Sequence, residues 1–134
     1  MKRHTDALKA LIQTVPALAA KTFVTLAPTT AVPYVVIHPM DGTDESTRLA
    51  GPNATQHPRF VIHSVGSTYE QCAAVAEAVK SKLVVGGLGV TPVVPGEQSG
   101  RLEYSSPTPI QIDTDVSPPL CYHVAEVTFE SVPA

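Results

Sequence analysis

The sequence predicts an α+β fold in which an antiparallel sheet carries two helices packed on one face. Apolar residues recur at helical spacing near the N-terminus and again in the middle of the chain, and β-prone runs lie on both sides of the second helical segment. These runs do not alternate with helices in the way that a parallel βαβ sheet requires. The length of 134 residues is that of one domain with a single core, over residues 1–134.

The first helix is expected close to the N-terminus. Thr5 is the predicted N-cap, and Asp6 would then place negative charge in the first turn, where the helix dipole favours it. Pro16 either kinks this helix or starts a short new one over Pro16–Lys21, because proline lacks the amide hydrogen of an interior position. One face collects apolar residues at helical spacing: Leu8, Leu11, Ile12 and Val15.

Three β-prone runs follow this helix. Phe23–Leu26 ends at an Ala-Pro pair, and Tyr34–His38 and Arg59–Val65 are rich in β-branched residues. The last two are expected to pair as antiparallel neighbours joined by the polar segment Met40–Pro58. A connection of that length in a small domain is usually functional or disordered. We therefore expect it to stay outside the core and to be ordered by a binding partner.

The second helix has the strongest pattern in the chain. Ser67 and Glu70 form a capping box that predicts its start, and a glycine-rich stretch that begins at Gly86 ends it after Val84. Its apolar stripe is expected to lie on the sheet and consists of Tyr69, Cys72, Ala76, Val79 and Leu83.

The C-terminal part of the chain is less regular. Arg101–Tyr104 and Pro109–Asp113 each predict a short strand in a segment rich in proline and glycine, and the sequence assigns no role in an assembly to residues 84–119. The closing run Tyr122–Glu130 alternates clearly. The more apolar face of this run also includes Cys121, the residue before it. The residues on this face are Cys121, His123, Ala125, Val127 and Phe129.

The composition restricts the possible function classes. Nine Lys and Arg residues are scattered along a chain of net charge −3, whereas a nucleic-acid-binding surface needs clustered cations. No apolar run approaches the roughly 18 residues of a membrane-spanning helix. Only 16% of the residues are charged, which fits either an apolar surface covered by a partner or an Ala/Val-rich monomer. Cys72 and Cys121 are expected to be buried thiols in a reducing compartment.

Patterns that would indicate catalysis or metal binding are weak. His38 and His63 end similar runs, VVIH and FVIH, and would lie close if their strands pair, but a zinc site needs at least a third ligand. Asp113 and Asp115 resemble a cation-binding DxD pair, although a solvated loop explains them better. No G-x-S-x-G elbow positions a nucleophilic serine. The sequence therefore predicts no enzymatic centre, bound metal or cofactor.

Several segments follow one another in a recognisable order. A helix with an internal proline leads to a short strand, an Ala-Pro turn, a Pro-Tyr strand and a glycine turn; a further strand, a capped helix and a closing strand come later. These segments are Ala7–Ala20, Ala27-Pro28, Pro33–Val36, Gly42, Arg59–Val65, Ser67–Val84 and Tyr122–Phe129. Their order resembles that of the tail-terminator (tail-completion) proteins of long-tailed bacteriophages. His123 stands where an arginine is common in that family.

The resemblance implies a structural virion protein. Such a protein would form a homo-oligomeric, six-fold ring that closes the end of the tail tube and joins the tail to the head connector. Its partners would be the tail tube protein and the head–tail connector protein, with DNA passing through the lumen without specific binding and no membrane contact. The ring would be assembled in the host cytoplasm. Two alternatives stay open: another neck or head-closure structural protein, and a small-molecule-binding α+β domain, which would be a monomer with one apolar pocket.

Charged residues outside the predicted core are the candidate contacts in such a ring. Arg48, Arg59 and Arg101 would face neighbouring subunits and pair with carboxylates such as Glu126. Acidic side chains in loops and at strand ends would keep the lumen neutral or acidic: Asp41, Asp44, Glu45, Glu97, Glu103, Asp113 and Asp115. The candidates for the subunit or tail-tube interface are Asp41, Asp44, Glu45, Arg48, Arg59, Arg101 and Glu126.

Overall fold

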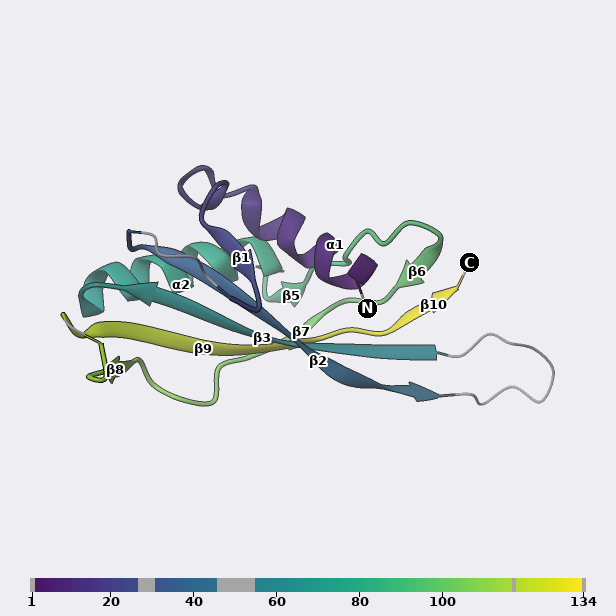
Figure 1. Ribbon diagram of the computed structural model, residues 1–134. Coiled ribbons are helices and arrows are strands. Elements are labelled where there is room, and N and C mark those ends of the chain that lie inside the picture. The colour runs from purple at the N-terminus through teal and green to yellow at the C-terminus, as the bar shows by residue number, and fades with distance from the viewer. Residues whose placement is uncertain (1, 27–30, 46–54, 117, 134) are drawn as a thin grey trace.

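The computed structural model describes residues 2–26, 31–45, 55–116 and 118–133, and for residues 41–45 it describes the backbone alone. Within these ranges the chain forms a mixed eight-stranded sheet that carries two α-helices on the same face (Figure 1). The predicted α+β class, with both helices on one face, is confirmed. The sheet pairs its strands antiparallel except at its first edge, where a three-residue strand joins in the parallel direction.

The elements in chain order are α1 (Lys2–Gln13), the 3₁₀ helix η1 (Pro16–Leu18), β1 (Thr22–Val24), β2 (Tyr34–Glu45), β3 (Thr55–Gly66), α2 (Tyr69–Leu83), β4 (Val84–Val85), β5 (Leu88–Gly89), β6 (Glu97–Ser99), β7 (Glu103–Ser105), β8 (Gln111–Asp113), β9 (Leu120–Thr128) and β10 (Ser131–Pro133). β3 is central, with β2 on one side and β9 and β10 on the other. β7 and β8 add to the far edge of β9, β6 adds to β10, and β4 and β5 form a separate hairpin.

The first helix starts earlier than the sequence predicts. Thr5 is buried inside α1 and is not its N-cap, so Asp6 does not lie in the first turn. The reason is tertiary: His4 also turns inward and binds a carboxylate of β6, which keeps the first turn helical. The expected apolar face is confirmed by Leu8 and Ile12, both fully buried, and Pro16 starts the short helix η1.

The second helix is confirmed almost residue for residue, with a shifted cap. Thr68, not Ser67, is the N-cap: its Oγ1 accepts a hydrogen bond from the Gln71 amide at 3.2 Å, and Gln71 Oε1 accepts one from the Ser67 amide at 2.7 Å. The prediction that Tyr69 belongs to the buried stripe was wrong, since this residue is 62% exposed. The reason is that the helix first meets the sheet at Cys72. The buried stripe is Cys72, Val75, Ala76, Val79 and Leu83.

The β2–β3 hairpin is longer than predicted. The strands pair antiparallel from Tyr34 opposite Val65 to Glu45 opposite Thr55, so most of the expected Met40–Pro58 connection is strand. Pro58 is fully buried, where we expected a segment outside the core. It fits because the register shifts next to it, where no ladder partner needs its missing amide hydrogen. Residues 46–54 of the connection lie outside the described residues.

The C-terminal strands complete the sheet. The two predicted short strands are confirmed as β7 and β8, and the alternation of the closing strand is confirmed in β9, where Ala125 and Val127 are buried. β6 and β10 were not predicted. Both cysteines are free, buried thiols, as expected. No helix in the described ranges is long and apolar enough to cross a bilayer.

Candidate assembly surface

The two faces of the sheet differ in what covers them. α1 and α2 lie over one face, and no helix of the described ranges lies over the other (Figure 1). The two-residue period of the strands sends Ile37 and Ile62, both fully buried, toward the helices. Their neighbours His38 and His63 therefore project from the opposite face, which we call the outer face. Because no described helix covers this face, another molecule can contact it directly.

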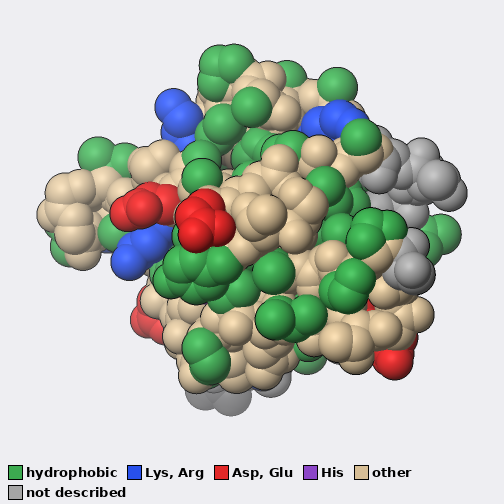
Figure 2. All heavy atoms as spheres, turned by 90° about the vertical axis from the view of Figure 1, so that its left-hand side faces the viewer, with side chains coloured by type: hydrophobic (Ala, Val, Ile, Leu, Met, Phe, Trp, Pro, Cys, Tyr) green, Lys and Arg blue, Asp and Glu red, His purple; other side chains and the backbone are tan. Residues whose placement is uncertain are grey.

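A cleft of about 540 Å³ opens on the outer face, at the end of the sheet where β2 begins and β3 ends. Apolar and aromatic side chains form much of its lining, among them Tyr34, Val36, Val65 and Tyr122. The strand ends and the N-terminus of α2 form the corresponding end of the molecule, where Figure 2 shows hydrophobic side chains among few charged ones. We refer to this pocket as the outer cleft.

Two histidines lie side by side in the outer cleft. Strand pairing places His63 opposite Val36, so that the rings of His38 and His63 meet with centroids 4.7 Å apart. Tyr122 lies on the other side, with its ring centroid 6.0 Å from that of His63. Burial, and then the nearby His38, lowers the pKa of His63. The neutral imidazole is therefore favoured at His63 at neutral pH.

Carboxylates line another side of the outer cleft. Asp113 ends β8, which pairs with the beginning of β9, and Asp115 lies two residues further on. Asp113 Oδ1 accepts a hydrogen bond from the Asp115 amide at 3.0 Å, which fixes the turn between them. Among the described residues that line the cleft, these two are the acidic ones and none is Lys or Arg. The lining of the cleft is therefore about equally polar and apolar, and it has an acidic side.

The predicted metal patterns partly converge here. His38 and His63 are close, as expected from strand pairing, and the DxD pair lines the same cleft. Within the described ranges, however, no three His, Cys, Asp or Glu side chains gather closely enough to hold a metal ion. The arrangement offers stacking surfaces, imidazole hydrogen bonds and negative charge, which suit recognition of a partner.

The predicted interface residues do not gather at one place. Arg59 and Glu126 are exposed and line one shallow groove of about 190 Å³ with Glu103, on the same outer face as the cleft. Arg101 is exposed near β5, where its Nη1 donates to the Gly89 carbonyl at 3.3 Å. Asp41, Asp44 and Glu45 belong to the backbone of β2, and their side chains and all of Arg48 lie outside the described part of the structure.

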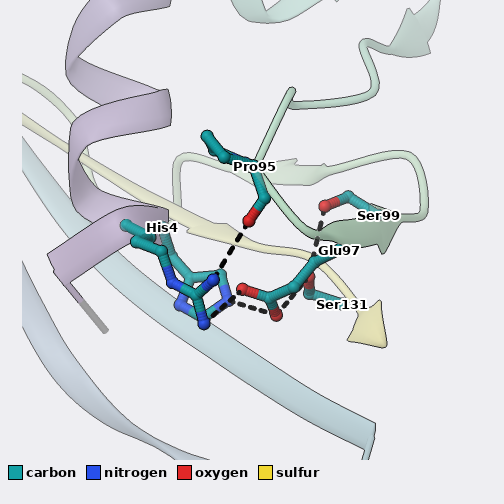
Figure 3. Close-up of polar contacts among 6 residues, drawn as sticks. His4, Pro95, Glu97, Ser99 and Ser131 are labelled. Carbon is teal, nitrogen blue, oxygen red and sulfur yellow. Dashed lines mark hydrogen bonds and ion pairs between the residues drawn. The ribbon is translucent and has the colours of Figure 1, made fainter. Parts of the chain in front are cut away.

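Glu97 was expected to face a lumen, and the structure contradicts this. Its side chain is 3% exposed and holds together the start of α1, β6 and β10 (Figure 3). Its Oε1 lies 3.0 Å from His4 Nε2 and accepts a hydrogen bond from Ser131 Oγ at 3.0 Å, while Arg3 Nη2 lies 3.4 Å from its Oε2. Burial alone would raise the pKa of Glu97, but the hydrogen bonds and the positive partners outweigh it and lower that pKa.

His123 makes local contacts. Its Nε2 lies 2.6 Å from Ser106 Oγ, which also donates to the Val124 carbonyl at 3.3 Å. Burial, and then the charge of Lys80, lowers the pKa of His123. The contact fastens the segment after β7 to β9. Sequence reasoning missed it because the two residues are 17 positions apart and carry no motif.

Comparisons with known proteins give a likeness of fold. No protein-family model matches the chain, and no curated protein matches it in sequence. Among solved structures, the fold is similar to that of a chain in a structure described as the virion of a native gene transfer agent (GTA) particle. That similarity has a TM-score of 0.58 at 19% sequence identity and covers 95% of this chain and 84% of the other. At this identity, the likeness is one of fold.

Proposed function

We propose that the protein is a structural virion component that forms a ring, closes the end of a phage-like tail tube and joins the tail to the head connector. The observation that carries the proposal is the fold shared with a chain of a virion particle over 95% of this chain. The order of elements, which resembles that of tail terminators, supports the finer assignment to the tail end and to a six-fold ring.

The surface of the molecule suits assembly. No helix among the described residues covers the outer face of the sheet, and β2 and β3 run on past the ends of both helices (Figure 1). Large apolar side chains are also exposed outside the outer cleft, such as Val85, Leu88 and Val93. Exposed apolar surface in a small, weakly charged protein is typical of a subunit that is covered by neighbours.

We also propose that the protein has no enzymatic centre. The nearest approach to a catalytic pair is Ser106 with His123, where the serine also donates to a backbone carbonyl. A serine nucleophile needs in addition a group that orients the histidine and donors for the developing oxyanion. A structural role for this pair, holding two segments of the sheet together, accounts for the contacts that it makes.

A small-molecule-binding domain is the second candidate, and the outer cleft favours it. Its volume of about 540 Å³ lies in the range of ligand sites, roughly 300–1,000 Å³. This candidate predicts a monomer at all concentrations and a ligand that protects the cleft. The assembly proposal predicts contacts between copies instead.

The test is the state of the full-length protein alone and on tail tubes. We expect light scattering to detect self-association and electron micrographs to show closed rings, alone or at the ends of isolated tail tubes from the same particle. Particles that lack the protein should carry tails that fail to join heads, and adding the purified protein should restore joining. A protein that stays monomeric and never binds tube ends would contradict the proposal.

A further inference from the structure

The hairpin β4–β5 exposes two large apolar side chains at its tip. Val85 and Leu88 are register partners in this hairpin and are 61% and 56% exposed. The turn between them consists of Gly86 and Gly87, both with positive φ, which suits glycine. Two aliphatic side chains held side by side in solvent form a small projecting apolar surface, and such a surface gains free energy when a partner covers it.

Backbone contacts at the base of the hairpin fix its position. The Val90 amide donates to the Leu83 carbonyl at 2.9 Å, and the Leu102 amide donates to the Val90 carbonyl at 2.9 Å. Gly89 packs so closely on the Leu102 backbone that no side chain would fit there. A surface fixed in this way loses little conformational entropy on binding, which is the condition for a useful contact.

Two exposed cations lie close to the hairpin, one in sequence and one by contact. Lys82 lies in the last turn of α2, three residues before Val85, and is exposed. Arg101 is also exposed, and its guanidinium reaches the Gly89 carbonyl next to the hairpin. The outer cleft has the opposite character, since Asp113 and Asp115 line it together with apolar and aromatic side chains. The tip and the cleft are therefore complementary in charge, and both expose apolar side chains.

The two surfaces lie on different sides of the molecule. The hairpin follows the C-terminus of α2 on the helix-covered side, whereas the cleft opens at the other face of the sheet (Figure 1). One chain therefore cannot fill its own cleft with its own hairpin. A contact between two different surfaces of identical copies is heterologous, and its repetition gives either a closed ring or an open chain.

We propose that the β4–β5 hairpin tip of one copy binds in the outer cleft of the next copy. Val85 and Leu88 enter the apolar part of the cleft, and Lys82 and Arg101 face Asp113 and Asp115. The rings of His38 and His63, whose centroids lie 4.7 Å apart, offer these side chains an aromatic surface. This inference rests on the proposed ring and identifies the surfaces that build it. It also gives residues 84–89, to which the sequence assigned no role, a part in assembly.

Engineered cysteines test the contact directly, even if association is weak. A copy carrying Leu88→Cys is mixed with a copy carrying Val116→Cys, since Val116 lines the cleft and is 40% exposed. The matched control replaces Leu88→Cys with Val93→Cys, an apolar residue outside the hairpin that is 83% exposed. Under a mild oxidant, we expect mixed dimers to form at least ten times faster for Leu88→Cys. The two native cysteines are buried and do not compete.

Charge reversal tests the polar part of the contact. The pair Lys82→Glu and Arg101→Glu, and separately the pair Asp113→Lys and Asp115→Lys, should each weaken self-association at least tenfold in sedimentation experiments. The variant that combines all four changes should regain association, because the tip is then negative and the cleft is positive. Circular dichroism spectra and unfolding midpoints of each variant confirm that it is folded.

The outcomes separate this inference from the proposed function. The hairpin–cleft contact would be overturned if Leu88→Cys and Val93→Cys cross-linked at equal rates. It would also be overturned if the variant with all four charge changes did not regain association. If the natural chain still forms rings on tail tubes in that case, the proposed function stands without the hairpin–cleft contact. Preferential cross-linking and charge rescue in a protein that forms only open chains would support the contact and contradict the ring.

Discussion

His38 and His63 meet edge to face across the paired strands β2 and β3, with ring centroids 4.7 Å apart. Burial and the neighbouring His38 both lower the pKa of His63, so the ring takes up a proton less readily in the folded chain than in the unfolded one. Asp113 and Asp115 line the same cleft. The outer cleft therefore holds a histidine whose protonation the fold disfavours.

We predict that the protein loses stability as the pH falls from 7.5 to 5.5, in part because of His63. The pKa of this residue is lower in the folded state, so its neutral form contributes stability that is fully present above the ordinary value of 6.5. That contribution is lost as the pH falls through the folded-state pKa. Urea unfolding at the two pH values should give a smaller difference in unfolding free energy for His63→Gln than for the natural chain.

His123 provides the internal reference for this experiment. The pKa of His123 is lowered as well, by burial and then by Lys80. His123 therefore also makes the free energy of unfolding fall as the pH falls, and this contribution persists in His63→Gln. An unchanged pH dependence in His63→Gln would contradict the prediction.

Glu97→Gln should destabilise the protein by about 1–3 kcal/mol at neutral pH, because a buried, charge-assisted hydrogen-bonding site loses its charge. The pKa of Glu97 is lowered in the fold, so its contribution is present above the ordinary carboxyl value of 4.5 and is lost as the pH falls through the folded-state pKa. The difference between the two proteins should therefore shrink in acid. Glu130→Gln, at an exposed position, is the control and should change the free energy of unfolding by less than about 0.5 kcal/mol.

The sequence predicted the elements whose signal is local. The buried stripe of α2 and the alternation of β9 follow from periods of 3.6 and 2 residues, and both are confirmed around Val79 and Ala125. The closeness of His38 and His63 followed from the same reasoning, since it needed only that two similar strands pair.

Features that depend on distant contacts were missed. Glu97 was taken for an exposed acid because nothing near it in sequence indicates burial; its partner His4 is 93 positions away. β6 and β10 are three-residue strands that exist through their pairing with each other and, at Ser131, with β3. The acidic side of the outer cleft likewise depends on β8 joining the edge of β9. Short strands of this kind carry too few residues for a periodic signal.

Gly89→Ala should destabilise the protein by about 1–3 kcal/mol, because its new methyl group would collide with the Leu102 backbone, which has no room to move. The same collision would displace the β4–β5 hairpin. Gly100→Ala is the matched control: its nearest contact would be Glu130 at 3.8 Å, and neither glycine has positive φ. Urea unfolding of both variants measures the difference, and equal stability of the two would show that the backbone at Gly89 relaxes freely.

The final prediction concerns DNA. A protein that lets DNA pass through a ring must not hold its phosphates, and each phosphate that a protein neutralises adds affinity through counterion release. The chain has net charge −3, and of its cations Lys2 and Arg3 already lie near Asp6 and Glu97. We expect fluorescence anisotropy to detect only weak binding to duplex DNA, with a dissociation constant above about 10⁻⁴ M at physiological salt, weaker than typical non-specific binders, and little change between 50 and 200 mM salt. Tight, strongly salt-dependent binding by the natural chain would instead indicate a DNA-holding surface, which a ring that only conducts DNA does not need.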